Sequence, residues 1–136
     1  DDRDARNALI IEEFRRNGGV ISSRPDQTIL LLGTIGARSR NERTNPVVYL
    51  SGEDCLYIFA THGGSPAHPD WYHNLVANPK VIVEVGAERY EAIAETVTGD
   101  DRDAIYAKQA TLRPNFGEYQ EKTTRVIPVV ALRRVT

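Results

Sequence analysis

The segment PVVYLSGEDCLYIFAT, residues 46–61, carries two short apolar runs separated by a polar turn. Residues 46–50 and 55–61 have the length and the branched and aromatic side chains of strands. The Ser51-Gly52-Glu53-Asp54 stretch between them is typical of a hairpin turn. Strands joined by so short a connection pair with each other in antiparallel orientation. The segment therefore predicts a β-hairpin.

A second hairpin is predicted at residues 81–85 and 89–97, with Gly86 in its turn. Apolar runs at residues 28–34 and 127–132 add two more strands. Hairpins in succession favour a mainly antiparallel sheet over the alternating strands and helices of a doubly wound fold. Because closing such a sheet removes its exposed edges, we expect a small barrel.

Helices are expected at three places around this sheet. Residues 4–17 form an amphipathic pattern that ends at Gly18-Gly19, residues 70–77 lie between prolines, and residues 100–112 follow a capping sequence. The apolar positions of the first helix are Ala5, Leu9, Ile10 and Phe14. The expected fold class is therefore mainly β with flanking helices.

The size and composition of the chain fit one globular domain. Its 136 residues, 40% apolar and 26% charged, divide into an N-terminal helix and loop and a barrel. The first part covers residues 1–27, with its loop at residues 22–25, and the second covers residues 28–136. The lone Cys55 suits a reducing compartment, so we expect a cytoplasmic protein.

The net charge and the apolar runs of the chain indicate which classes of partner to expect. A net charge of −2 gives no overall basic field, so we expect no nucleic-acid binding. The longest apolar runs are too short to span a bilayer. The chain opens on Asp1 and not on methionine, so we expect a preceding segment, which could carry a membrane anchor.

The stretch at residues 36–46 combines basic and small hydrogen-bonding side chains between two predicted strands. Arg38, Arg40 and Arg43 accompany a single acid, Glu42. A guanidinium offers a planar fork of donors that fits phosphate or carboxylate oxygens in pairs, and the N–H groups of a tight loop add further donors. The stretch therefore predicts a site for an anionic ligand, although a solvated surface loop would explain the same residues.

Residues 60–74 form a second segment with features of a binding site. Gly63-Gly64 at the end of a predicted strand allows the backbone to approach a flat ligand or to adopt positive φ. Trp71 and Tyr72 follow at the start of a predicted helix, whose N-terminal N–H groups favour an anion. Packing against the barrel explains Tyr72, whereas for Trp71 we favour a place in the wall of a ligand pocket.

A third segment, residues 112–120, carries Phe116 and Tyr119 three positions apart. Their side chains either close over a pocket or pack in the core at helical spacing. The sequence does not choose between these two placements.

Several other chemistries lack their sequence signatures. His62, His68 and His73 are spaced unlike zinc ligands, so we expect no metal site. The chain contains no Gly-x-Ser-x-Gly elbow and no Gly-x-Gly-x-x-Gly after a strand. Hydrolase and NAD-type dinucleotide sites are therefore not supported.

Taken together, these segments resemble the deazaflavin-dependent nitroreductase family of actinobacteria, whose members use reduced coenzyme F-420. The motifs that carry the resemblance are Gly36-x-Arg38-Ser39, Arg43-x-Asn45-Pro46, Gly63-Gly64, His68-Pro69-x-Trp71-Tyr72-x-Asn74-Leu75, Ala77-Asn78-Pro79, Tyr119-Gln120 and Ile127-Pro128-Val129. The resemblance implies a split β-barrel of the FMN-binding-like kind, in agreement with the predicted hairpins.

The resemblance also implies the residues of the site. F-420 carries a phosphodiester and an oligoglutamate tail, both anionic, for which the matching residues are Arg38, Ser39 and Arg43. The residues implied to bind the rest of the coenzyme are Asn45, Pro46, Val47, Val48, Ala60, Thr61, His62, Gly63, Trp71 and Asn74. Those implied to bind the acceptor are Trp71, Phe116 and Tyr119. Thr61 and Tyr119 are the catalytic candidates, since either could stabilise charge on the acceptor or supply a proton.

Some positions depart from the family pattern. Arg40 stands where members usually have Gly, and His62 and Ala67 stand where Lys is frequent. Arg113 replaces a usual aromatic residue, and Phe116 has no hydroxyl where relatives can carry Tyr. His62 and Ala67 reduce the positive charge near the ring and tail, whereas Arg40 makes its loop bulkier and more basic. The hydroxyl missing at Phe116 predicts weak reduction of nitroimidazoles.

The implied activity is hydride transfer from reduced F-420 to a small-molecule acceptor: a quinone, an activated enone or a nitroaromatic compound. The coenzyme supplies the redox chemistry, so no strong base is needed. An FMN-dependent reductase or oxidase on the same barrel is an alternative, and so is a non-catalytic module that carries a deazaflavin, haem or a lipid. A quinone reductase in peripheral contact with a membrane is a third, and the protein is expected as a monomer or homodimer.

Overall fold

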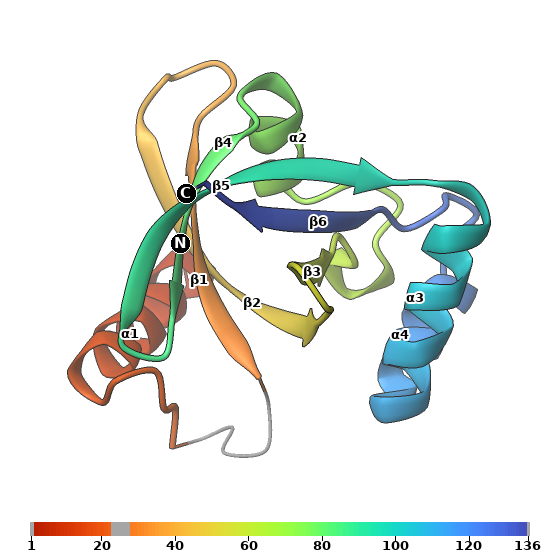
Figure 1. Cartoon of the computed structure of the whole chain (residues 1–136), viewed down its shortest axis with the longest axis horizontal. Helices are drawn as coiled ribbons and strands as arrows, with labels where there is room; N and C mark the ends of the chain where they lie inside the picture. The colour runs from red at the N-terminus through yellow and green to blue at the C-terminus, as the bar shows by residue number, and fades with distance from the viewer. Residues whose placement is uncertain (1, 23–27, 136) are drawn as a thin grey trace.

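Both predicted hairpins are present in the computed structural model, which describes residues 2–22 and 28–135 and, of these, the side chains from residue 4 onward. Six antiparallel strands close into a barrel in the order β1-β2-β3-β6-β5-β4 (Figure 1). The strands are β1 (Ile29–Ile35), β2 (Glu42–Ser51), β3 (Leu56–Phe59), β4 (Lys80–Val85), β5 (Glu88–Val97) and β6 (Val129–Arg134). The prediction of a mainly β barrel with flanking helices is confirmed.

Four α-helices and one 3-10 helix accompany the strands in the described part of the chain. They are α1 (Asp2–Arg16), η1 (His62–Gly64), α2 (Asp70–Ala77), α3 (Gly99–Leu112) and α4 (Pro114–Glu121). The sequence did not predict α4, which begins at a proline, where the missing N–H group costs nothing. Figure 1 shows α3 and α4 side by side at one end of the barrel and α1 at the other. The predicted loop at residues 22–25 lies outside the described residues beyond Ser22.

Strand β1 is buried on both faces because α1 covers its outer side. Leu30 and Leu32 point into the barrel core, and Leu31 packs on the other face with Phe14 of α1. Leu9 was expected on the buried face of α1, but it is 67% exposed. The buried stripe of the helix includes Ile10 and Phe14, four residues apart, and Leu9 falls on another side of the helix.

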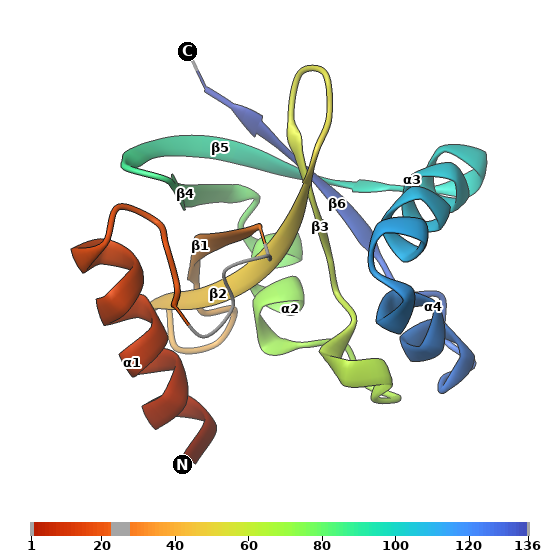
Figure 2. The ribbon, with the colours of Figure 1, turned by 90° about the horizontal axis from the view of Figure 1, so that it is seen from below.

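Strand β2 begins at Glu42 and not at the predicted residue 46, because its pairing with β1 continues as far as Glu42. Glu42 lies opposite Ile35, so the second half of the predicted basic loop is strand and not loop. Its neighbour β3 pairs only with residues 49–51 of β2. Among the described residues, the stretch 42–48 therefore has a paired strand on one side only. Figure 2 shows β2 and β3 diverging from their hairpin turn, with α2 seen between them.

The unpaired edge of β2 accommodates Pro46 in the middle of a strand. Tyr49 N donates to Thr28 O at 3.0 Å, so the N–H group of Tyr49 faces the β1 side. Successive N–H groups along an antiparallel strand point alternately to its two sides. Pro46 is three positions before Tyr49, so its ring nitrogen faces away from β1. Residues 44–50 are all half-buried, unlike the fully buried centre of β1. This edge, defined here as residues 42–48, is open to a ligand.

Candidate functional site

The basic loop between β1 and β2 is a tight turn closed by its own backbone. Gly36 N donates to Asn41 O at 2.8 Å, and Arg40 N donates to Gly36 O at 2.9 Å. A Cβ atom at Gly36 would collide with Ser39 Oγ, which accepts a hydrogen bond from Asn41 N. Arg40 has φ +60°, a left-handed conformation that favours glycine. The arginine at this position therefore carries backbone strain that a glycine would avoid.

The arginines of this loop are free to bind a ligand. Arg38, Arg40 and Arg43 are exposed, and within residues 28–135 and 4–22 none of them has an ion pair or a side-chain hydrogen bond. Arg40 lines a shallow hollow beside the C-terminal end of α2, next to Ala37 and Asn78. Unpaired guanidinium groups beside an open strand edge suit an anionic ligand better than a neutral one.

Asn74 of α2 holds this loop in place. Its side chain is 8% exposed. Its Oδ1 atom accepts from Ala37 N at 2.9 Å, and its Nδ2 atom donates to Thr34 Oγ1 at 3.2 Å. Both ends of the amide are thus used by the protein. Direct contact of Asn74 with a coenzyme stays a prediction, and the position of the basic loop depends on this side chain.

The chain makes an unusual turn directly after β3. Thr61 is in the right-handed helical region, whereas His62 (φ +47°), Gly63 (φ +64°) and Gly64 (φ +81°) are all left-handed. Such a change of hand can turn N–H groups toward an anion, but here Thr61 N, Gly64 N and Ser65 N already donate to carbonyl oxygens of the same segment. Gly63 is exposed, and a Cβ atom there would meet nothing within 4 Å. The predicted residues Thr61, His62 and Gly63 therefore share one turn, which is anion-compatible through the N–H group of Gly63.

Arg125, which the sequence did not single out, organises this turn from the segment before β6. Its guanidinium donates to the carbonyl oxygens of Ser65 (2.9 Å), Ala60 (3.0 Å) and Thr61 (2.8 Å). It also donates to His68 Nδ1 at 2.9 Å. Burial, followed by the positive charges of Arg125 and His73, lowers the pKa of His68. His68 is therefore neutral at pH 7 and able to accept this hydrogen bond.

Tyr119 approaches the same turn from α4. A Cβ atom on Gly64 would lie 2.9 Å from Tyr119 O, so α4 contacts the turn that carries Thr61. The Tyr119 ring is half-buried, with its centroid 5.6 Å from that of Phe116. Asn115 Nδ2 donates to the Tyr119 hydroxyl oxygen at 3.1 Å. The hydroxyl hydrogen is thus left to donate elsewhere. The structure brings the two catalytic candidates onto contacting elements.

Two predicted pocket residues lie mostly in the core. Trp71 is 8% exposed and packs in the barrel core with Leu75 of the same helix. Phe116 is 6% exposed and meets the Phe59 ring edge-on at a centroid distance of 5.6 Å. Tyr72 is half-buried, and its hydroxyl lies 3.2 Å from Thr96 Oγ1. A role for Trp71 and Phe116 in the wall of a ligand site stays a prediction.

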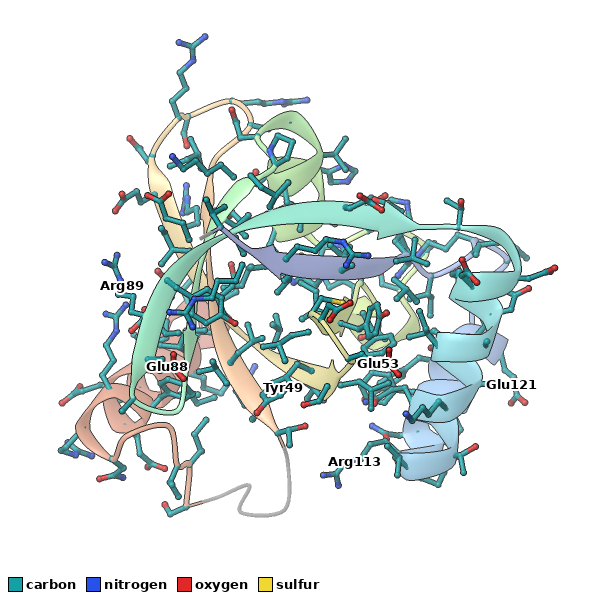
Figure 3. All side chains as sticks on the ribbon, in the orientation of Figure 1. Tyr49, Glu53, Glu88, Arg89, Arg113 and Glu121 are labelled. Carbon is teal, nitrogen blue, oxygen red and sulfur yellow. The ribbon has the colours of Figure 1, made fainter. Side chains whose placement is uncertain are left out.

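Arg113 occupies the junction of α3 and α4, and Figure 3 shows it at the end of the helix pair far from the start of α3. Figure 3 also shows Glu53 at the turn between β2 and β3. A second hollow is found there, lined by residues of that turn, by Tyr57 and by Ile105 and Lys108 of α3. This hollow does not include any residue of the predicted coenzyme site.

The described residues contain no group of three or more His, Cys, Asp or Glu side chains able to hold a metal ion. In the same part of the chain, no helix combines the length and the apolar character needed to cross a membrane.

The fold and the site define a small-barrel protein with an open strand edge, an unpaired basic loop and an anion-compatible turn. Comparison with known proteins narrows this class. The profile of the F420H(2)-dependent quinone reductase family matches residues 8–134, and the chain belongs to this family. The F420H(2)-dependent quinone reductase of Mycobacterium tuberculosis H37Rv is 41% identical over 108 residues, which cover 77% of this chain and 72% of the relative. A second, putative F420H(2)-dependent quinone reductase from the same strain is 29% identical over 99 residues, which cover 71% of this chain and 83% of the relative.

Solved structures agree with the fold. An F420-H2 dependent reductase has a TM-score of 0.71 and 34% identity, covering 78% of this chain and 94% of that one. A protein described as a domain-swapped dimer has a TM-score of 0.74 and 32% identity, covering 97% and 98%. A haem storage protein of Vibrio cholerae, at 16% identity and a TM-score of 0.61, shares the fold alone. The predicted split β-barrel of the FMN-binding-like kind is confirmed.

Proposed function

We infer that this chain is an oxidoreductase that uses reduced coenzyme F-420 to reduce a quinone. Its membership of the F420H(2)-dependent quinone reductase family supports this function. The observation in the structure that carries it is the row of unpaired arginines beside an open strand edge. Arg38, Arg40 and Arg43 have no partner in the described part of the chain, so an anionic ligand would complete their hydrogen bonds.

The residues present fit a coenzyme with a long anionic tail. Arg38 and Arg43, with Ser39, would hold the phosphodiester and the carboxylates. The open edge of β2, including Asn45, Pro46, Val47 and Val48, would lie along the ring, with the turn at Thr61, His62 and Gly63 on its other side. Ala60 is fully buried and would support this turn from behind. Bound F-420 supplies the hydride. The protein contributes orientation and exclusion of water.

Charge that develops on the acceptor needs a donor, and two candidates are in place. The Tyr119 hydroxyl keeps its hydrogen available because Asn115 donates to its oxygen. The Thr61 hydroxyl and the N–H group of the exposed residue Gly63 lie on the turn that α4 contacts. We assign proton donation to Tyr119, and stabilisation of the acceptor oxygen to the turn.

The acceptor is a small molecule, and we also propose where in the cell the protein reduces it. Many quinones reside in membranes, so we propose a cytoplasmic protein that makes peripheral contact with a membrane when it acts on them. The domain-swapped dimer among the solved structures supports a homodimer as an alternative to the monomer. Enones and nitroaromatic compounds are further candidate acceptors.

Cofactor choice tests the proposal directly. In a fluorescence titration of the purified protein, we expect F-420 to bind more tightly than FMN. The affinity for F-420 should fall as salt is added, because the contacts are ionic and salt screens them. Steady-state assays with reduced F-420 and a water-soluble quinone then measure turnover. Equal or tighter binding of FMN would overturn the assignment and favour a flavin-dependent reductase on the same barrel.

Replacing Tyr119 with Phe should lower the rate of quinone reduction and leave F-420 affinity nearly unchanged. Only the hydroxyl is lost, and loss of a general acid typically costs about 100-fold or more in rate. Single-turnover hydride transfer and a separate coenzyme titration measure the two effects. Tyr90→Phe in β5, whose ring centroid lies 4.5 Å from the Arg134 guanidinium, is the matched control and should leave both unchanged. A wild-type rate for Tyr119→Phe with every acceptor would remove this residue from the mechanism.

A further inference from the structure

Arg125 stands out among the cations of this chain because it is bound almost entirely to backbone. Its acceptors are the carbonyl oxygens of Ala60, Thr61 and Ser65 and the ring nitrogen of His68. The carbonyl groups come from both ends of the turn after β3. One planar guanidinium therefore ties together the two ends of this turn.

The bonds from Arg125 complement those that the turn makes with itself. Gly64 N donates to Thr61 O at 2.9 Å, and Ser65 N donates to His62 O at 3.0 Å. Thr61 O thus accepts from both the backbone and Arg125. Gly63 and Gly64 adopt positive φ without steric cost, but His62 at φ +47° is strained, and such a conformation persists only where its surroundings hold it. Arg125 is the side chain that does so here.

Arg125 also leaves its charge unbalanced. No carboxylate lies within ion-pair distance of its guanidinium in the described part of the chain, and the neighbouring His68 accepts a hydrogen bond from it. By contrast, the half-buried Arg102 of α3 pairs with Asp103 at 3.1 Å. A half-buried cation behind a turn with an anion-compatible backbone adds attraction for an anion at that turn.

We propose that Arg125 is a positioning residue for the coenzyme: it fixes the turn at residues 60–65 and places an unbalanced positive charge behind it. The turn can then bind an anionic part of F-420 at the end of β3, away from the basic loop. Arg125 itself acts through the turn and touches neither coenzyme nor acceptor. This inference rests on the proposed function.

The test compares Arg125→Lys and Arg125→Gln with Arg102→Lys. Arg102 is a matched control because it also binds backbone, through Ile127 O at 3.1 and 2.9 Å, but contacts no residue of the turn. We expect Arg125→Lys to weaken F-420 binding about tenfold, and Arg125→Gln to weaken it further with a shallower salt dependence, because the charge is also lost. The KM for F-420 should rise while kcat at saturating coenzyme changes little.

Arg102→Lys should lower the melting temperature and leave F-420 affinity within about twofold. A second pair of variants changes glycines and leaves both half-buried arginines in place. Gly63→Ala strains the turn directly and should also weaken F-420 binding. Gly86→Ala places the same strain in the turn between β4 and β5, where φ is +58° and a Cβ atom also meets nothing within 4 Å. This control variant should not weaken F-420 binding.

Hydrogen exchange of the ligand-free protein gives an independent readout. The amides of Gly64 and Ser65 should exchange faster in Arg125→Lys than in the wild type or in Arg102→Lys. Wild-type F-420 affinity in both Arg125 variants, or equal losses in Arg102→Lys, would overturn this inference and leave the proposed function standing. Absence of F-420 binding by the wild-type protein would instead overturn the proposed function and this inference together.

Discussion

Trp71→Ala should lower the free energy of unfolding by about 3–5 kcal/mol, the usual cost of removing a buried tryptophan side chain. Trp71 is 8% exposed and packs inside the barrel with Leu30, Leu32 and Leu75. Truncation leaves a cavity that the closed barrel cannot easily collapse. For a domain of this size, the melting temperature should fall by roughly 10–20 °C. Urea unfolding followed by far-ultraviolet circular dichroism measures the change, since the only tryptophan is lost.

Trp71→Phe is the control, because it keeps an aromatic ring in the core and should cost much less. If Trp71 also lines the coenzyme site, Trp71→Phe should weaken F-420 binding while leaving the protein folded. A loss of less than about 1 kcal/mol in Trp71→Ala would contradict the structural role. In that case the ring would belong chiefly to the wall of a ligand site.

Arg38→Ala and Arg43→Ala should each weaken F-420 binding roughly ten- to a hundredfold. Each change removes a charge-assisted hydrogen bond worth about 1.5–3 kcal/mol. Neither guanidinium has a partner in the described part of the chain, so stability should change by less than about 0.5 kcal/mol. Coenzyme titrations at two salt concentrations, with thermal melts of each variant, separate binding from folding.

Arg40 supplies the matched control within the same loop. Arg40→Ala should affect F-420 binding less than the other two changes, because Arg40 lies outside the family pattern. Arg40→Gly should in addition raise the melting temperature, since it relieves the left-handed backbone at φ +60°. If none of these substitutions changes the dissociation constant, the loop is a solvated surface and the coenzyme site must be sought elsewhere.

Local sequence patterns were sufficient to predict most strands of the barrel. Alternating apolar runs and short polar turns located the hairpins, whose pairing in residues 81–97 follows from strands separated by a few residues. The basic loop and the glycines after β3 were visible for the same reason, because turns and charges are properties of neighbouring residues. The sequence also indicated helices at residues 70–77 and 100–112, close to their observed bounds.

Other features depended on which face of an element meets another. Leu9 and Phe14 both belong to an apolar helix, but only the packing of α1 on β1 decides which is buried. The open edge of β2 arises because β3 turns away after a few paired residues, and nothing within β2 encodes that divergence. For Trp71, the sequence motif predicted a ligand contact, whereas the structure shows a residue packed in the barrel core.

The sequence by itself determined the strand order along the chain, the hairpins and the location of the basic loop, because each depends on residues adjacent in the chain. The tertiary structure alone decided how the site is held. Arg125 lies 65 residues from Ala60, 64 from Thr61 and 60 from Ser65, yet binds the carbonyl oxygens of all three. A backbone carbonyl is the same in every residue, so no sequence pattern can show which ones a distant guanidinium will meet once the barrel closes.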